Sequence, residues 1–266
     1  MSKEMSLMEH FAELRARVIR AIITVMAISA GSFAFSLRNS DVGGFTVYYL
    51  FPDPFHNIAA QFLQKLQEDL VPEYVRVIVT TPGEAIFSLF YVSIFLGIAL
   101  GMPMIVYQLG KFVAPGLYPH EKRLILRMAI PSAALFIGGA IFAYFYVIPF
   151  TLNFLFRYAL SVNLTTFLTI TSFVSFVLMF LLAFGLAFQM PIIMVGLTSV
   201  GVVESDFWKR NFNYAAVGML IFGALITPDG SGITMFLVAG PMLVLYAAGY
   251  LLTTYHKVKI GIGPLS

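Results

Sequence analysis

Two glutamates stand beside basic residues in a chain that is otherwise poor in charge. Glu13 lies four residues before Arg17, and Glu121 is followed directly by Lys122 and Arg123. Taken singly, each carboxylate is explained by a local ion pair, which at a surface is worth ~0–1 kcal/mol. If both face one groove, they offer two acceptors to a partner with adjacent arginines. Each charge-assisted contact is then worth roughly 1.5–3 kcal/mol, and the planar guanidinium favours arginine over lysine.

The segment around Glu121 is a short polar loop between two long apolar runs. Pro115 and Pro119 prevent a continuous helix through it, because proline lacks an N–H and clashes with the preceding turn. We therefore expect a stiff, hydrated loop between two membrane helices, shaped to bind a positively charged peptide.

Side chains that could carry out catalysis lie outside the apolar runs. The four histidines and the five aspartates fall in loops or at the ends of runs, so an intramembrane protease would lack its buried catalytic groups. We find no cluster of histidines and carboxylates with metal-site spacing. The chain has no cysteine, which excludes disulfides and thiolate metal sites. We expect no enzymatic activity and no metal or cofactor.

The strongest polar residue inside an apolar run is Gln189, two residues before Pro191. It could bond to a neighbouring helix of the same chain, or to the carbonyl that Pro191 leaves without a donor. It could instead be the polar contact for a partner helix in the bilayer. A neutral amide cannot relay a proton as a carboxylate can, which disfavours a proton-coupled carrier.

The composition is that of an integral membrane protein. Of 266 residues, 59% are hydrophobic and 11% are charged, against roughly 45–50% and about 25% in soluble domains. The net charge of +3 is too small to indicate nucleic-acid binding. We expect an all-α fold in a single domain, residues 1–266.

Six apolar runs predict six transmembrane helices, because a span needs about 20 apolar residues. The fifth run is short. The first is preceded by a short amphipathic helix, 1–17 with its body at 6–17, expected to lie in the membrane interface before the chain turns inward. The long excursion 38–83 contains an apolar stripe from Phe55 to Leu70, which predicts an amphipathic helix. The six runs are 18–37, 85–108, 124–150, 171–200, 211–226 and 233–252.

The distribution of Lys and Arg predicts the orientation, since cytoplasmic loops carry the excess. Twelve lie in the N-terminal segment, the loops after the second and fourth runs, and the tail, whereas four lie in the opposite loops. Both termini and the Glu121 loop are therefore expected in the cytoplasm.

Five segments together resemble the TatC family, the multispanning subunit of the twin-arginine protein translocase. The resemblance covers about residues 7 to 252, and any one segment alone would be weak evidence. The segments are His10-Phe-Ala-Glu-Leu-Arg15, the loop Tyr107-Gln-Leu-Gly-Lys-Phe-Val-Ala-Pro-Gly-Leu-Tyr-Pro-His-Glu-Lys-Arg123, Phe142-Ala-Tyr-Phe145 with Pro149, Phe184-Gly-Leu-Ala-Phe-Gln-Met-Pro191 and Thr227-Pro-Asp229.

The resemblance implies a receptor for signal peptides with paired arginines, in a complex that moves folded proteins across the cytoplasmic (inner) membrane, driven by the proton-motive force. It implies TatA- and TatB-like single-span partners and several copies of the chain in the complex. Many relatives carry glutamate where this chain has Gln189. We expect Gln189 to contact a partner helix at this position. The positions that match the peptide-binding site are Glu13, Arg15, Phe112, Pro115, Leu117, Tyr118 and Glu121.

Two other functions remain open from the residues alone. A small-solute or ion transporter predicts a polar path through the spans, for which only Gln189 and scattered Ser and Thr are available. A non-receptor assembly subunit of the membrane predicts that Glu13 and Glu121 can be replaced freely.

Overall fold

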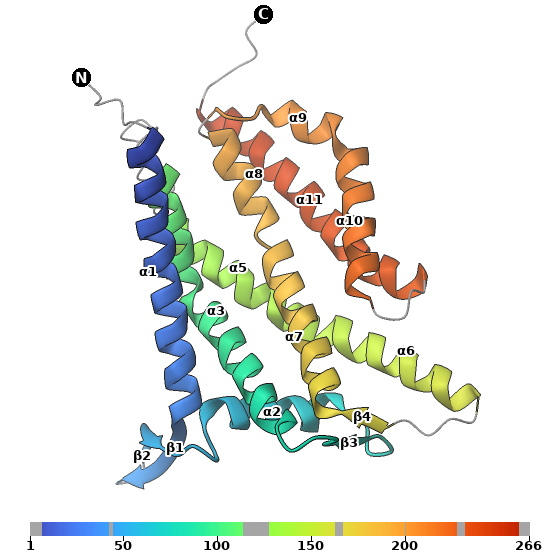
Figure 1. Ribbon diagram of the computed structural model, residues 1–266. Coiled ribbons are helices and arrows are strands. Elements are labelled where there is room, and N and C mark those ends of the chain that lie inside the picture. Colours follow the sequence, from blue (N-terminus) through green and yellow to red (C-terminus); the bar gives the residue numbers. More distant parts are fainter. Residues whose placement is uncertain are drawn as a thin grey trace, which may run out of the picture. The chain divides into compact units, whose positions relative to one another are not determined.

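The computed structural model (Figure 1) describes residues 7–42, 45–113, 128–162, 167–199, 201–227 and 232–260. The chain divides into two compact units, one of residues 1–108 with 152–179 and one of residues 109–151 with 180–266. Helices dominate both. The elements are α1 (Leu7–Ala34), β1 (Phe35–Val42), β2 (Phe45–Pro52), α2 (Ile58–Leu70), β3 (Arg76–Ile78), α3 (Glu84–Val113), α5 (Ala129–Phe142), the π-helix η2 (Ala143–Val147), α6 (Ile148–Ser161), β4 (Phe167–Thr169), α7 (Ile170–Ala187), α8 (Met190–Ser199), α9 (Ser205–Arg210), α10 (Phe212–Ile226) and α11 (Gly232–Ile260).

Five described segments are long and apolar enough to cross a membrane, and α10 is a shorter apolar helix. They correspond to the six predicted runs, with boundaries that differ. The third helical segment continues through η2 and α6 to Ser161, whereas the third run was expected to end at residue 150. The fourth is interrupted at Phe188 and Gln189, just before Pro191, which has no N–H for the helical ladder.

The expected separate interfacial helix at 6–17 is wrong for its described part. Residues 7–34 form one uninterrupted helix, because neither proline nor glycine separates the amphipathic stretch from the apolar run. The first apolar run also stops being helical earlier than predicted. The helix ends at Ala34, and the last three residues of the run, 35–37, start β1.

A β-hairpin follows α1 directly. β1 and β2 pair antiparallel, with Phe35 opposite Pro52 and Leu37 opposite Leu50. Later in the same unit, β3 and β4 form a two-stranded parallel sheet in which Val77 lies opposite Leu168. The β-branched residues of 76–81 favour extended structure, as β3 shows, but the sequence analysis did not predict the hairpin.

The predicted amphipathic helix of the first excursion is confirmed as α2. Asn57 caps it, since its Oδ1 accepts a hydrogen bond from the Ala60 N–H at 2.9 Å. Its apolar stripe is buried, with Leu66 fully inaccessible. Phe55 was wrongly placed in that stripe, because it precedes the helix and is exposed.

Close helix contacts in both units depend on glycine. In the first unit, a Cβ on Gly97 of α3 would lie 2.1 Å from Ser29 Oγ and 2.7 Å from the Val25 carbonyl oxygen of α1. In the second unit, a Cβ on Gly139 of α5 would lie 2.5 Å from the Phe184 carbonyl oxygen of α7. Small residues let helix backbones approach closely, which is how membrane helices associate without a hydrophobic driving force.

Candidate functional site

Glu13 projects from the cytoplasmic end expected for α1. Arg17, one turn later, donates from Nε to Glu13 Oε1 at 2.9 Å and also contacts that oxygen through Nη2. Both side chains are largely covered, at 21% and 16% exposure. The local ion pair that the sequence allowed is therefore confirmed, but it occupies one carboxylate oxygen. Glu13 Oε2 is buried and has no hydrogen-bond partner among the described residues.

The other residues of the predicted peptide site divide into two groups. Arg15 is exposed on α1, and Phe112 is half-buried in the last turn of α3. Lys111 in that turn complements the negative end of the helix dipole. The predicted site residues Pro115, Leu117, Tyr118 and Glu121 lie outside the described residues, so a shared groove for Glu13 and Glu121 stays a prediction.

Gln189 is buried between α7 and α8 and bonds to α5. The Ser132 hydroxyl donates to Gln189 Oε1, and Gln189 Nε2 donates to the Ser132 carbonyl oxygen at 3.0 Å. Nε2 also donates to the Gly185 carbonyl oxygen at 3.3 Å. The expected bond to a neighbouring helix of the same chain is confirmed. Sequence reasoning missed Ser132, which lies 57 residues away.

The break in the helix explains why the Gly185 carbonyl is available. The Gln189 backbone N–H donates to Leu186 at 3.0 Å, three residues earlier, instead of to Gly185. Pro191 has no N–H, so the regular ladder cannot continue through it. The side chain of Gln189 takes the position that its own backbone N–H would otherwise fill.

A second polar cluster connects α9 to α8 and α11. The Trp208 indole Nε1 donates to Thr198 Oγ1 at 2.9 Å, and the Tyr246 hydroxyl donates to the Trp208 carbonyl oxygen at 2.9 Å. Ser205, at the start of α9, lies 3.1 Å from Thr253 Oγ1. The only tryptophan of the chain therefore ties a short surface helix to two longer ones.

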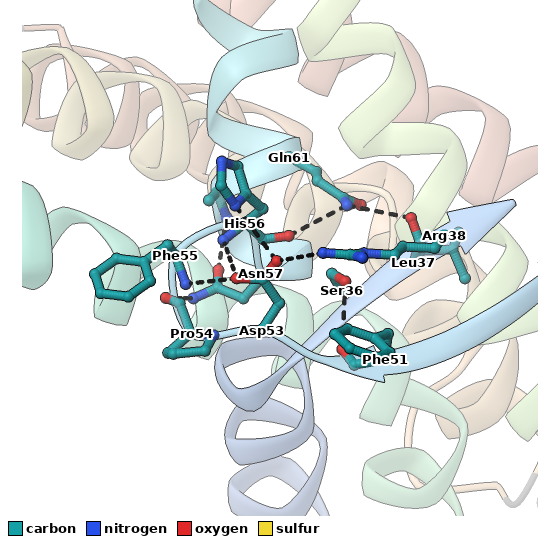
Figure 2. Close-up of polar contacts among 11 residues, drawn as sticks. Ser36, Leu37, Arg38, Phe51, Asp53, Pro54, Phe55, His56, Asn57 and Gln61 are labelled. Atoms are coloured by element: carbon teal, nitrogen blue, oxygen red, sulfur yellow. Dashed lines mark hydrogen bonds and ion pairs between the residues drawn. The ribbon is translucent and has the colours of Figure 1, made fainter.

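Asp53 ties the hairpin to the turn that precedes α2, as Figure 2 shows. Asp53 Oδ1 accepts from the backbone N–H groups of Phe55 and His56, each at 3.0 Å, and Arg38 Nη2 donates to Oδ2 at 2.7 Å. The backbone bond from His56, followed by the Arg38 bond, lowers the pKa of the Asp53 carboxyl to about 2. Arg38 also lies over the Phe51 ring, 4.3 Å from its centre.

Within the part of the chain that the structure describes, no three His, Cys, Asp or Glu side chains gather where they could hold a metal ion. The polar clusters around Gln189 and Trp208 hold helices together. Glu13 Oε2, without a donor among the described residues, could accept a hydrogen bond from a bound partner.

The apolar helices define a multi-pass membrane protein. A family model described as Sec-independent protein translocase protein (TatC) matches residues 9–241. Three proteins named Sec-independent protein translocase protein TatC are similar over nearly their whole lengths. That of Cenarchaeum symbiosum is 45% identical, covering 92% of this chain and 93% of the relative. That of Aquifex aeolicus is 35% identical, covering 91% and 92%, and that of Carboxydothermus hydrogenoformans is 33% identical, covering 97% and 96%.

A solved structure has the same fold. A crystal structure titled as the twin arginine translocase receptor TatC, in the detergent DDM, matches with a TM-score of 0.75 and 32% identity, covering 92% of this chain and 99% of that one. The chain belongs to the TatC family of Sec-independent protein translocase proteins.

Proposed function

We propose that this translocase component is the receptor subunit that binds signal peptides with paired arginines. It takes part in the export of folded proteins across the cytoplasmic (inner) membrane, driven by the proton-motive force, and it has no chemical active site. The observation that carries the proposal is the Glu13 carboxylate, whose buried Oε2 has no hydrogen-bond partner among the described residues. The similarity of the whole chain to a protein titled as the twin arginine translocase receptor supports the same function.

The geometry of Glu13 suits an incoming guanidinium. A buried carboxylate oxygen without a donor is costly, and a charged donor recovers more than a neutral one. Arg17 already satisfies Oε1, so a peptide arginine can bond to Oε2 without displacing it. In this proposal Glu13 binds Arg17 of its own helix through Oε1 and an arginine of the signal peptide through Oε2.

The loop after α3 supplies the second half of the site in this proposal. Glu121 accepts the second arginine, and Phe112, Pro115, Leu117 and Tyr118 shape the surface around it. Arg15 stands on the exposed side of the same helix as Glu13.

The proposed topology has six membrane spans with both termini in the cytoplasm, as the Lys and Arg distribution favours. TatA- and TatB-like single-span proteins and further copies of the chain complete the complex within the bilayer. Gln189 contacts a partner helix in this scheme. Because its amide is already bonded to Ser132, the partner must compete with that bond or approach beside it.

Photo-crosslinking tests the receptor proposal. A photoreactive residue is placed beside Glu121, and membranes are exposed to a signal peptide with Arg-Arg or with Lys-Lys. We expect crosslinking that depends on Arg-Arg and is lost in Glu13→Ala and in Glu121→Ala.

Glu9→Ala is the matched control, since it removes the same charge one turn earlier on α1. Crosslinking should persist in this variant. Equal crosslinking of both peptides in all variants would refute the receptor assignment and favour a non-receptor assembly subunit.

A further inference from the structure

One face of the hairpin formed by β1 and β2 is apolar and uncovered. Residues opposite each other in an antiparallel pair point to the same face, and the register places Phe35 with Pro52 and Leu37 with Leu50. Phe35, Leu37 and Leu50 are 37%, 47% and 61% exposed. We call the side that carries these four residues and Tyr48 the apolar face of the hairpin.

The opposite face is mixed, and part of it is bound to the protein. It carries Ser36, which is fully buried, and Arg38, which pairs with Asp53 (Figure 2). The Gln61 amide of α2 donates to the Leu37 carbonyl oxygen at 3.2 Å, so α2 also satisfies part of the outer edge of β1. Val47, Tyr49 and Phe51 on this face are 49%, 44% and 42% exposed. Both faces therefore carry apolar side chains, but only the first has apolar residues on both strands at the hairpin base.

The apolar face changes character from base to tip. After the two apolar pairs at the base comes Asn39 opposite Tyr48, and then Asp41 opposite Thr46, whose hydroxyl donates to Asp41 Oδ1 at 2.9 Å. This order is apolar, then amphipathic, then polar. Tyrosine in the middle position is typical of the boundary between membrane and water, where its ring is apolar and its hydroxyl is hydrated.

The length of α1 places the hairpin base at that boundary. Arg20 is the last charged residue before the helix end at Ala34, and the helix between them covers about 21 Å at 1.5 Å per residue. The hydrocarbon core is about 30 Å thick. The apolar strand residues 35–37 extend the uncharged stretch at about 3.3 Å each, and Arg38 is the next charge.

We propose that the apolar face of the hairpin lies in the headgroup and upper acyl region of the leaflet at the outer end of α1. The hairpin base completes the first membrane crossing, Tyr48 sits at headgroup level, and Asp41 and Thr46 reach water. The occupant is lipid because the face continues directly, without a connecting loop, from the exposed apolar surface of a membrane span. The inference goes beyond the receptor function and does not depend on it.

Spin labelling tests the immersion of this face. The chain has no cysteine, so a single introduced one is labelled uniquely. Leu50→Cys reports on the apolar face, and Tyr49→Cys, the next residue and 44% exposed, reports on the opposite face at matched depth. Each protein is placed in nanodiscs with one chain per disc and no other subunit. Collisions with oxygen, which partitions into lipid, are compared with those of a water-soluble nickel chelate.

We expect the ratio of oxygen to nickel accessibility to be several-fold higher at residue 50 than at residue 49. Leu37→Cys, opposite Leu50, serves as a second reporter should the first variant fail to fold. Equal ratios on the two faces would overturn the proposal. A label at residue 50 shielded from both reagents would also overturn it, because protein and not lipid would then cover the face.

Discussion

Ser132 and Gln189 exchange hydrogen bonds in both directions. The Ser132 hydroxyl donates to the amide oxygen of Gln189, while the Gln189 amide donates to the Ser132 carbonyl oxygen at 3.0 Å. Both residues are buried. The pair fixes α5 against the point where α7 gives way to α8, just before Pro191, which has no N–H to continue the helical bonding.

Breaking this pair should destabilise the protein. Ser132→Ala removes the hydroxyl donor and Gln189→Leu removes the amide, each at an expected cost of about 1–2 kcal/mol, as for other hydrogen bonds between membrane helices. The double variant should cost less than the sum, because the two residues act on each other. Thermal unfolding in detergent measures all three. Additive losses would show that the pair does not couple.

Glycine at position 97 should be required for the contact between α1 and α3. Gly97→Ala places a methyl group against Ser29 Oγ and the Val25 carbonyl oxygen, and such overpacking typically costs about 1–3 kcal/mol. Gly31→Ala is the control, because no atom of the described residues lies within 4 Å of its added Cβ. Alanine there should be neutral or stabilising, as the better helix former. Similar unfolding temperatures for both variants would contradict the close contact.

The junction between the hairpin and α2 should weaken only in strong acid. The Asp53 pKa falls from 3.8 to about 2 on folding, so its contribution is fully present above about pH 4 and is lost as the pH falls through 2. Hydrogen exchange at the amides of Phe55 and His56, corrected for intrinsic rates, measures the loss. Asp53→Asn should show no transition in this window. A transition near neutral pH in the native chain would mean that a group other than Asp53 sets the pH dependence of this junction.

Glu13 and Arg17 should affect peptide binding unequally. Glu13→Ala removes a charged acceptor, and an effect of about 1.5–3 kcal/mol weakens binding of an Arg-Arg peptide by roughly ten- to a hundredfold. Arg17→Ala frees Glu13 Oε1 from an internal pair worth ~0–1 kcal/mol, so binding should tighten by at most about fivefold. Titration of a fluorescent signal peptide measures both. Equal losses would mean that Arg17 orients Glu13 for the peptide.

The helices could be predicted from sequence because long apolar runs leave a chain few alternatives in a bilayer. The amphipathic helix α2 could be predicted from its stripe, and Asn57 is a favourable cap at its start. The hairpin was missed because residues 35–37 read equally well as the end of a span. A signal was present in the Gly43-Gly44 dipeptide, flanked by residues with strand propensity.

The candidate site could be predicted less completely. Glu13 was identified by its charge and its spacing from Arg17, but spacing cannot show that the described part of the chain pairs only one of its carboxylate oxygens. The partner of Gln189 could not be predicted, since a serine on another helix carries no local signal of its contacts. Such pairs are set by how helices pack, which depends on residues far apart in sequence.

The parallel pairing of β3 with β4 constrains how the chain is threaded through the bilayer. Ile78 and Thr169 lie side by side in register, shortly before α3 and directly before α7. Two points that touch must be on the same side of the membrane, so the chain between them makes an even number of crossings. Any insertion that added one membrane crossing between β3 and β4 would put the two strands on opposite sides of the membrane. Their three-residue pairing would then be lost.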